Sequence, residues 1–224
     1  MQLKNWGNNM RLRKVKHAIE TINNYPNIVV QNPEQFLGNW KAVFKNNNPI
    51  YLEIGMGKGK FIIEHAKRNP NINYIGLEKE ESVLVRAVEK ICDEPLNNLL
   101  LIHEDAFLIN TIFNKGEIDK IFLNFSDPWP KSRHAKRRLT CNTILNNYRE
   151  ILSLNGTIEM KTDNRKLFEY SLQEFVSNGL PIQNLSLNLH EDLEDIVTTE
   201  YEDKFVAKGN VIYFIEVSNN GKKL

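Results

Sequence analysis

The stretch of sequence that decides the fold reads Ile50-Tyr51-Leu52-Glu53-Ile54-Gly55-Met56-Gly57-Lys58-Gly59. Its first five residues predict a buried strand, and its three glycines predict a tight turn into a helix over residues 58–68. Glycine adopts positive φ and lets the backbone approach a ligand without a Cβ clash. The N-terminus of the helix after such a turn favours an anionic group, for example the carboxylate of an amino-acid tail. We therefore expect a strand, a cofactor loop containing Gly55, Gly57 and Gly59, and a helix.

Strand-like and helix-like segments continue to alternate after this loop. We expect strands over 73–78, 99–103, 118–125 and 157–161, and helices over 81–92, 140–152 and 164–178. Strict alternation implies parallel strands joined by right-handed crossovers, and hence an open sheet that is covered on both faces. The last two expected strands, 182–189 and 211–217, break this rhythm because a polar stretch separates them.

This pattern fits a seven-stranded sheet better than a symmetric dinucleotide-binding fold. The sequence predicts an α/β fold of the Rossmann-like methyltransferase type, with a mostly parallel sheet, helices on both faces and a last antiparallel strand. Ligands of such sheets bind at the carboxyl ends of the strands, where the strand order reverses. Residues 1–48 are polar, rich in asparagine and weakly periodic, which predicts an N-terminal arm that lies over the domain rather than in its core. Residues 49–224 are then the methyltransferase domain.

The composition excludes several classes of protein. The chain has 41% hydrophobic and 25% charged residues, and no apolar run approaches the roughly 18 residues that a membrane span needs. The first residues lack the apolar core of a secretory signal. Cys92 and Cys141 have no CxxC or Cys/His spacing, so we expect neither a metal site nor a disulfide. These features predict a cytoplasmic protein.

The spacing of the glycines indicates which cofactor the loop binds. A dinucleotide site requires the pattern G-x-G-x-x-G, but the position for its last glycine is Lys60. The pattern G-x-G-x-G favours S-adenosylmethionine instead. A turn without any ligand is the alternative interpretation.

Acidic residues at the ends of three successive strands support the same cofactor. Glu78 has the spacing from the glycines at which an acid accepts hydrogen bonds from ribose hydroxyls, and Asp105 follows the third strand, where an acceptor can meet the adenine amino group. Glu53 would lie near the sulfonium or the methionine end. Each acid, taken alone, can also be a solvated loop residue, and Glu53 can face solvent.

The segment Leu123-Asn124-Phe125-Ser126-Asp127-Pro128-Trp129-Pro130 follows the fourth strand. Its two prolines remove backbone donors and stiffen the loop, and Trp129 offers a flat face for a base or for packing. Beside a cofactor loop, this segment would present Asp127 to the transferred methyl group. A rigid turn with a packed tryptophan is the alternative.

A basic octet, Lys131–Arg138, follows directly and places five cationic residues in eight positions of a chain whose net charge is only +1. Arg11, Arg13, Lys14 and Lys16 form a second basic cluster. Such runs are usually solvated, but Arg and Lys beside a stacking aromatic suit a phosphate backbone with an exposed base. Replacement of Arg137 and Arg138 is therefore expected to weaken binding of a nucleic acid and to reduce its salt dependence.

The same stretches closely resemble the bacterial tRNA (guanine-N7-)-methyltransferase family. The resemblance runs from about Arg11 to Val217 and is carried by EIGMGKGKF (53–61), NINYIGLE (71–78), LNFSDPWPKSRHAKRRLT (123–140), KTDNRKLFEYSL (161–172) and TTEYEDKF (198–205). The long segment at 123–140 is far more specific than a glycine loop. Met1–Asn9 depart from the pattern because they precede the family-like start at Met10-Arg11.

The resemblance implies a class I methyltransferase fold, S-adenosylmethionine as the methyl donor and a guanine of the tRNA variable loop as the acceptor. It implies cofactor contacts at the glycine loop and at Glu53, Glu78, Asp105, Ala106 and Asp127, of which Asp127 also matches the catalytic position. It implies substrate contacts at Lys131, Asp163, Thr199, Glu200, Tyr201 and Glu202. It implies RNA contacts at Arg133, His134, Ala135, Lys136, Arg137 and Arg138. Without the resemblance, Asp163 reads as a helix N-cap and Thr199–Glu202 as a solvated loop.

Three other functions stay open on the residues alone. An amino-group methyltransferase acting on a protein or small molecule has a similar short Asp-Pro-aromatic loop, but it does not need the basic octet. A non-catalytic RNA-binding module would not need the intact cofactor loop with Glu78 and Asp105. A nicotinamide oxidoreductase is disfavoured by Lys60. The partner expected is tRNA, and the chain can be a monomer or a homodimer.

Overall fold

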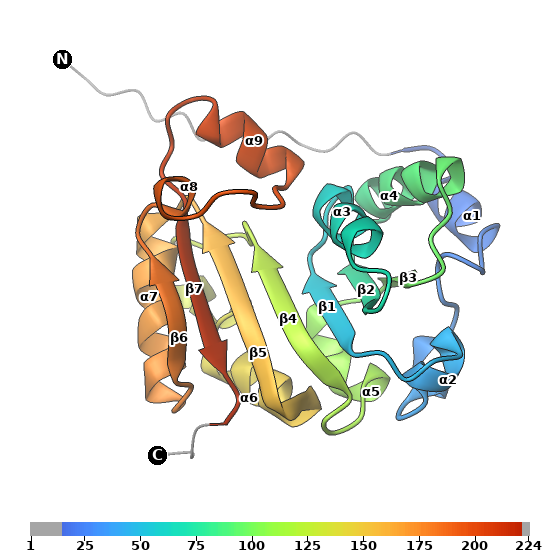
Figure 1. The fold of residues 1–224 in the computed structure, drawn as a ribbon, viewed down its shortest axis with the longest axis horizontal. Helices are drawn as coiled ribbons and strands as arrows, with labels where there is room; N and C mark the ends of the chain where they lie inside the picture. Colours follow the sequence, from blue (N-terminus) through green and yellow to red (C-terminus); the bar gives the residue numbers. More distant parts are fainter. Residues whose placement is uncertain (1–14, 221–224) are drawn as a thin grey trace.

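A seven-stranded sheet runs through the computed structural model, which describes residues 15–220 (Figure 1). The strands are β1 (Ile50–Ile54), β2 (Asn73–Glu78), β3 (Leu99–His103), β4 (Ile118–Asn124), β5 (Leu152–Thr162), β6 (Ile182–Ser186) and β7 (Tyr213–Ser218). Their order in the sheet is β3-β2-β1-β4-β5-β7-β6. Strands β1 to β5 pair in parallel, and β7 runs antiparallel to β5 and β6. The predicted fold class is therefore confirmed.

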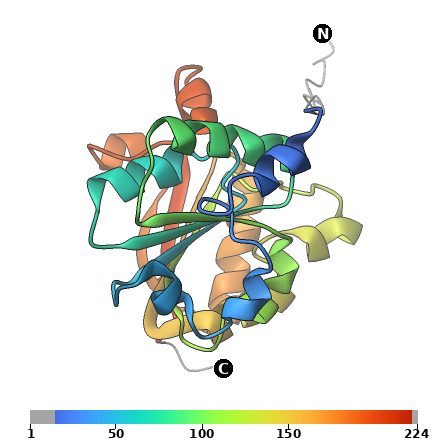
Figure 2. The same cartoon turned by 90° about the vertical axis from the view of Figure 1, so that its right-hand side faces the viewer.

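Helices cover both faces of the sheet, which Figure 2 shows nearly edge-on. The α-helices are α1 (Ala18–Asn23), α2 (Trp40–Phe44), α3 (Lys60–Arg68), α4 (Glu81–Asp93), α5 (Ile109–Ile112), α6 (Asn142–Ile151), α7 (Arg165–Ser177), α8 (Leu189–Asp192) and α9 (Glu200–Val206), and the 3-10 helices are η1 (Pro33–Phe36), η2 (Ala106–Leu108) and η3 (Ser132–Arg137). The apolar stripes of α5, α6 and α7 form one core cluster with the sheet, and those of α1, α3 and α4 form another. This is the two-sided burial that strict strand–helix alternation predicts.

The carboxyl ends of the central strands meet at one edge of the sheet, where the strand order reverses between β1 and β4. The chain leaves β1 toward β2 on one side, while β4 and β5 lie on the other. Helix α9 lies over this edge, above the ends of β4 and β5 (Figure 1). The topology thus places the glycine loop, the reaction loop after β4 and the C-terminal part of the chain around one crevice.

Several element boundaries differ from the predicted ones. Strand β5 starts at Leu152 instead of Thr157 and contains Gly156, where a Cβ would lie 2.9 Å from the Leu152 side chain. Strand β6 ends at Ser186, three residues earlier than expected. Thr199–Glu202, which the residues alone indicated to be a solvated loop, instead form the cap and first turn of α9. The loop interpretation was therefore wrong.

The segment before β1 packs into the core, so its interpretation as an arm outside the core needs correction for residues 18–44. Trp40 is fully buried, and its indole nitrogen donates a hydrogen bond to the Ile112 carbonyl at 2.9 Å. Val29 forms a parallel bridge with Leu101 of β3. The domain boundary at residue 48 stays a prediction. Arg11, Arg13, Lys14 and the departure at Met1–Asn9 lie outside the described residues.

Candidate active site

The glycine loop connects β1 to α3 with three residues of positive φ. Gly55 (φ 72°) and Gly57 (φ 60°) border open space, since a Cβ at either position would meet nothing within 4 Å. At Gly59 (φ 78°), a Cβ would lie 2.9 Å from the Cβ of Ala87, so this glycine allows α3 to pack closely against α4. The amide of Gly55 donates to the Leu77 carbonyl of β2 at 2.8 Å, which fixes the start of the loop. The loop is therefore both anchored and open to a ligand.

A cavity of about 640 Å³ lies at the carboxyl ends of the strands, next to this loop. It is lined by residues of the glycine loop, the ends of β2 and β3, and the loop after β4. Six residues that the sequence predicted for the site line it, namely Gly55, Glu78, Asp105, Ala106, Asp127 and Arg137. Phe125, Trp129 and Leu139 add apolar surface. An enclosure of this size with a few convergent polar groups is typical of small-molecule sites.

Glu78 and Asp105 are held in place by backbone donors. One carboxylate oxygen of Glu78 accepts from Gly57 N at 3.0 Å, and the other accepts from Lys79 N and Glu80 N, both at 2.9 Å. Burial raises the pKa of Glu78, and these three donors oppose the rise. Asp105 caps η2 by accepting from Phe107 N at 2.9 Å. Both acids are therefore positioned rather than free loop residues.

Glu53 is buried, with 1% of its surface exposed, so the alternative that it faces solvent was wrong. Its Oε1 accepts a hydrogen bond from Asn124 Nδ2 at 2.9 Å, while its buried Oε2 has no hydrogen-bond partner among the described residues. Burial raises the pKa of Glu53 to about 8, against the lowering effects of the Asn124 hydrogen bond and the charge of Lys161. A cationic or hydrogen-bonding ligand group would satisfy this orphaned oxygen.

Replacement of Glu53 by Gln is expected to flatten the pH dependence of stability in the ligand-free protein. Between pH 4.5 and about 8, the folded protein retains a proton on Glu53 that the unfolded chain releases. The contribution of this group to the free energy of unfolding therefore falls as pH rises through that window. Glu53→Gln should become progressively more stable relative to wild type from pH 5 to pH 8. Urea denaturation across this range measures the difference.

The matched control is Glu34→Gln, which changes an exposed glutamate of η1. This control should show no trend in relative stability between pH 5 and pH 8. A Glu53→Gln protein whose stability relative to wild type is also constant over this range would contradict the raised pKa.

The loop after β4 holds two aromatic residues in the left-handed region, Phe125 (φ 52°) and Trp129 (φ 40°). Residues other than glycine rarely adopt this backbone conformation, and it persists only where the surroundings enforce it. Phe125 N donates to the Lys161 carbonyl at 2.8 Å. The Trp129 ring has the Arg137 guanidinium over it at 4.8 Å and the His134 ring at its edge, 5.7 Å away. Asp127, which lies between Phe125 and Trp129 in the chain, is exposed and lines the cavity.

The basic octet divides into an exposed part and an inward-facing part. Lys131, Arg133 and Lys136 are exposed on η3 and the residue before it, and His134 and Ala135 are half-buried. Arg137 is exposed at the rim of the cavity. Arg138 turns inward, because its Nε donates to the Pro128 carbonyl at 3.1 Å and its Nη2 to the Trp129 carbonyl at 3.0 Å.

Asp163 and Tyr201 do not line the cavity itself but form a neighbouring edge, where Tyr201 contacts the lining residue Phe125. The Tyr201 hydroxyl donates to Asp163 Oδ2 at 3.3 Å, and its ring centroid lies 5.0 Å from that of Phe125 in the loop after β4. Burial raises the pKa of Tyr201 to about 12, helped by the Asp163 carboxylate. The N-cap of α7 is Asn164, which accepts from Leu167 N at 2.9 Å, so the reading of Asp163 as the cap was wrong.

The side chains of the remaining predicted residues at this edge contact other parts of the protein. Thr199 and Glu202 form a capping box at the start of α9, and Glu200 forms an ion pair with Lys90 of α4. Glu202 is fully buried, with its carboxylate 2.7 Å from Lys161 Nζ and 3.0 Å from His190 Nε2. Its side chain is therefore inaccessible to a substrate in this conformation.

The sequence interpretation missed Lys161, which is the residue before the last one of β5 and is 2% exposed. Its ammonium group also donates to the Val197 carbonyl at 2.9 Å and lies 4.8 Å from the centre of the Phe61 ring. Lys161 thus joins the sheet to α9 and α3 beneath the crevice. One signal could have indicated its surroundings, because Thr199-x-x-Glu202 has the spacing of a capping box and predicts a helix above this strand end.

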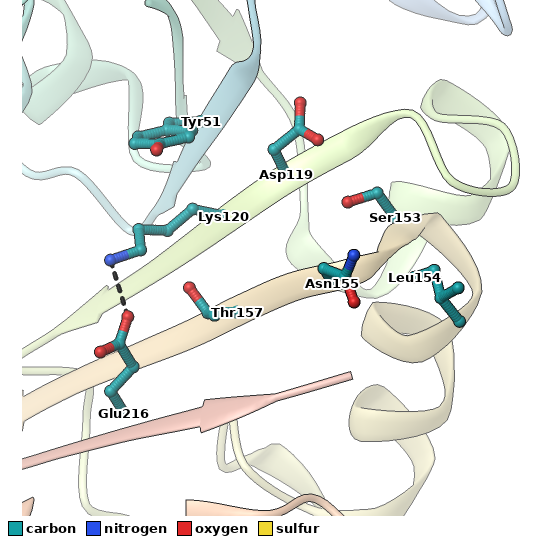
Figure 3. Close-up of a pocket in the computed structure, with 8 residues that line it drawn as sticks. All are labelled: Tyr51, Asp119, Lys120, Ser153, Leu154, Asn155, Thr157 and Glu216. Atoms are coloured by element: carbon teal, nitrogen blue, oxygen red, sulfur yellow. Dashed lines mark ion pairs between the residues drawn. The ribbon is translucent and has the colours of Figure 1, made fainter. Parts of the chain in front are cut away.

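A second cavity of about 550 Å³ lies toward the amino ends of β1, β4 and β5. Figure 3 shows the residues that line it, among them Lys120 and Glu216, which are joined by an ion pair. Lys120 is paired with Glu216 at 2.8 Å and with Glu159 at 2.9 Å, so its charge is already neutralised by the protein.

In residues 15–220 no cluster of three or more His, Cys, Asp or Glu side chains is arranged to hold a metal ion. None of the helices in that range is long and apolar enough to cross a bilayer.

Comparisons with known proteins agree with this geometry. A family model described as "Putative methyltransferase" matches residues 47–215. A tRNA (guanine-N(7)-)-methyltransferase of Bacillus cytotoxicus is 52% identical over 208 residues, which cover 92% of this chain and 96% of the relative.

Solved structures share the fold at much lower identity. A structure of an antibiotic-related methyltransferase matches with a TM-score of 0.61 at 20% identity, covering 81% of this chain and 92% of that one. The 16S rRNA methyltransferase KamB matches with a TM-score of 0.63 at 12% identity and the same coverage. The fold and the family model agree with the much closer curated relative. This chain therefore belongs to the tRNA (guanine-N7-)-methyltransferase family, whose members are S-adenosylmethionine-dependent enzymes.

Proposed function

We propose that this enzyme transfers a methyl group from S-adenosylmethionine to N7 of a guanine in the variable loop of tRNA, in the cytoplasm. The observation that carries the proposal is the cavity in which Asp127, on a strained loop, faces the open glycine cradle beside an exposed basic edge. The name of the Bacillus cytotoxicus relative supports both the acceptor atom and the RNA.

The residues of the cavity fit the cofactor. Glu78, Asp105 and Ala106 all line the cavity, which supports the proposal that Glu78 accepts from the ribose hydroxyls and that Asp105 with Ala106 meets the adenine. Gly55 and Gly57 leave room for the methionine part. Glu53 does not line the cavity, but its unpartnered Oε2 would accept a hydrogen bond or a cationic group of the bound cofactor. When bound, S-adenosylmethionine supplies an electrophilic methyl group on a sulfonium sulfur.

The chemistry requires positioning more than proton transfer. Guanine N7 carries an in-plane lone pair, so no general base is needed to create the nucleophile. Most of the acceleration then comes from aligning N7 with the methyl group and excluding water. Methylation makes the purine ring cationic, and the Asp127 carboxylate stabilises that developing charge or holds the N–H edge of the base.

The two edges of the crevice would hold the tRNA. The target nucleotide binds between these edges. It is bordered by the side chains of Lys131, Asp163 and Tyr201 and by the backbone of Thr199 and Glu200. Arg133, Lys136 and Arg137 are exposed cations that suit neighbouring phosphates, with His134 and Ala135 between them. Glu202 contributes through the helix that it holds, because its own side chain is buried.

Incubation of unmodified tRNA with methyl-labelled S-adenosylmethionine tests this function. Label should enter the tRNA, and subsequent borohydride and aniline treatment should cleave the chain at one variable-loop guanine. The matched control is the same transcript with adenine at that position, which should take up no label. Labelled tRNA that resists cleavage would reject the N7 assignment but keep the methyltransferase, whereas absence of label would reject tRNA as the substrate.

A further inference from the structure

We infer that Arg138 is a positioning residue that holds the Asp127 loop in its reactive shape, and not a contact to RNA. The inference rests on the proposed function, since it concerns how the loop that carries Asp127 is held. It separates Arg138 from the five residues before it, with which the sequence groups it.

The contacts of Arg138 point into the protein. Its guanidinium spans two successive carbonyls, those of Pro128 at 3.1 Å and Trp129 at 3.0 Å. The Tyr170 ring of α7 covers the guanidinium, with the Cζ atom 4.2 Å from the ring centroid. The hydrogen bonds fix the planar guanidinium within its plane, and the stacked ring fixes it perpendicular to that plane. The neighbouring Arg137 instead lies exposed over Trp129.

The loop needs such a support because its own backbone is strained. Trp129 has φ 40°, a conformation that is unfavourable for a residue other than glycine and persists only when the surroundings enforce it. Pro128 and Pro130 provide no amide hydrogen, so the loop cannot tie itself down through its own N–H groups there. Arg138 instead holds this part of the loop through two of its carbonyls.

The support is itself anchored to a rigid element. We call the Arg138 guanidinium with its two carbonyl contacts the clamp. Thr140, two residues after Arg138, shares a buried hydrogen bond of 2.7 Å with Ser171 of α7. Tyr170 and Ser171 therefore dock the end of the basic segment onto α7 at two adjacent points. Asp127 lies one residue before the clamped carbonyls, so a shift of the clamp would move it relative to the cavity.

The experiment compares Arg138→Lys with Arg138→Gln, and sets both against the same changes at Arg137. In both Arg138 variants, kcat should fall by about tenfold to a hundredfold, as expected when a reacting group is misplaced by about 1 Å. Lysine should fail to rescue, because an ammonium group cannot span two carbonyls and stack on a ring. The dependence of tRNA affinity on salt concentration should stay that of wild type in both.

The Arg137 variants provide the contrasting pattern. Arg137→Gln should raise KM for tRNA. It should also make the negative slope of log affinity against log salt shallower by about one, the value for loss of one phosphate contact. Arg137→Lys should restore that slope, since it restores the charge. If Arg138→Gln makes the slope shallower and Arg138→Lys restores it, Arg138 is a phosphate contact and the inference is wrong.

A second variant acts on the clamp from the other side. Tyr170→Leu removes the ring under the guanidinium and should lower kcat in the same way as Arg138→Lys, while Tyr170→Phe keeps the ring and most of the rate. Circular dichroism and urea denaturation report whether each variant is folded, independently of the cavity that the Asp127 loop lines. Wild-type kcat in a folded Arg138→Lys protein would overturn the inference without touching the proposed function, which fails only if the wild-type enzyme does not methylate guanine N7.

Discussion

The Asp127→Ala variant is expected to methylate tRNA about 10²- to 10³-fold more slowly than the wild-type enzyme, the usual cost of removing one group that stabilises developing charge. Asp127 lines the cavity on a loop whose two flanking aromatic residues are held at positive φ. The loss should fall on the chemical step, because the positive charge on guanine develops only as the methyl group moves. Single-turnover rates at saturating S-adenosylmethionine measure that step directly.

Binding of tRNA provides the internal reference. Asp127 is one acidic residue beside several exposed cations, so its removal should leave tRNA affinity unchanged or slightly stronger. Asp127→Asn is the matched control, since it keeps the shape of the side chain and removes its charge. If the carboxylate acts through its charge, Asn should be almost as slow as Ala. If Asp127→Ala methylates at a near-normal rate, the assigned role is wrong.

The part of the fold that could be predicted is the part with a strong local signal. The strands from β1 to β4 are continuous apolar runs bounded by turn residues, and their predicted and observed limits agree within one residue. The loop residues at their carboxyl ends followed from topology alone, which is why Gly55, Glu78, Asp105 and Asp127 meet at one cavity as expected.

The rest depended on contacts that no local pattern shows. In Thr157-Ile158-Glu159-Met160-Lys161, alternation assigns Lys161 to a solvated face, and Glu159 on that face is indeed partly exposed. Lys161 is buried because α9, the Val197 carbonyl before it and the Phe61 ring of α3 all pack against it. Helix α9 has only seven residues and depends on tertiary packing. Arg138 was grouped with its neighbours for a similar reason. A run of cations does not reveal which member the 3-10 helix turns inward.

Replacement of Lys161 by Met is expected to destabilise the protein by about 3–5 kcal/mol, because it leaves the Glu202 carboxylate buried without its counter-charge. Both side chains are almost fully inaccessible, and the ion pair spans 2.7 Å between the sheet and α9. Methionine has a similar length and no charge, so the loss reports the charge rather than a cavity. Urea denaturation in the absence of cofactor measures it.

The double variant Lys161→Met/Glu202→Gln separates an unpaired charge from simple loss of packing. Glutamine at the third position of a helix still completes a capping box with Thr199, so this change neutralises Glu202 without removing the cap. The double variant should therefore recover much of the stability that Lys161→Met loses, which a double-mutant cycle records as a large coupling energy. If the two changes add instead, the pair does not hold the sheet to α9 through its charges. Activity tests the same ion pair. If the double variant regains its stability but does not methylate tRNA, the ion pair is needed to hold α9 where Tyr201 borders the site.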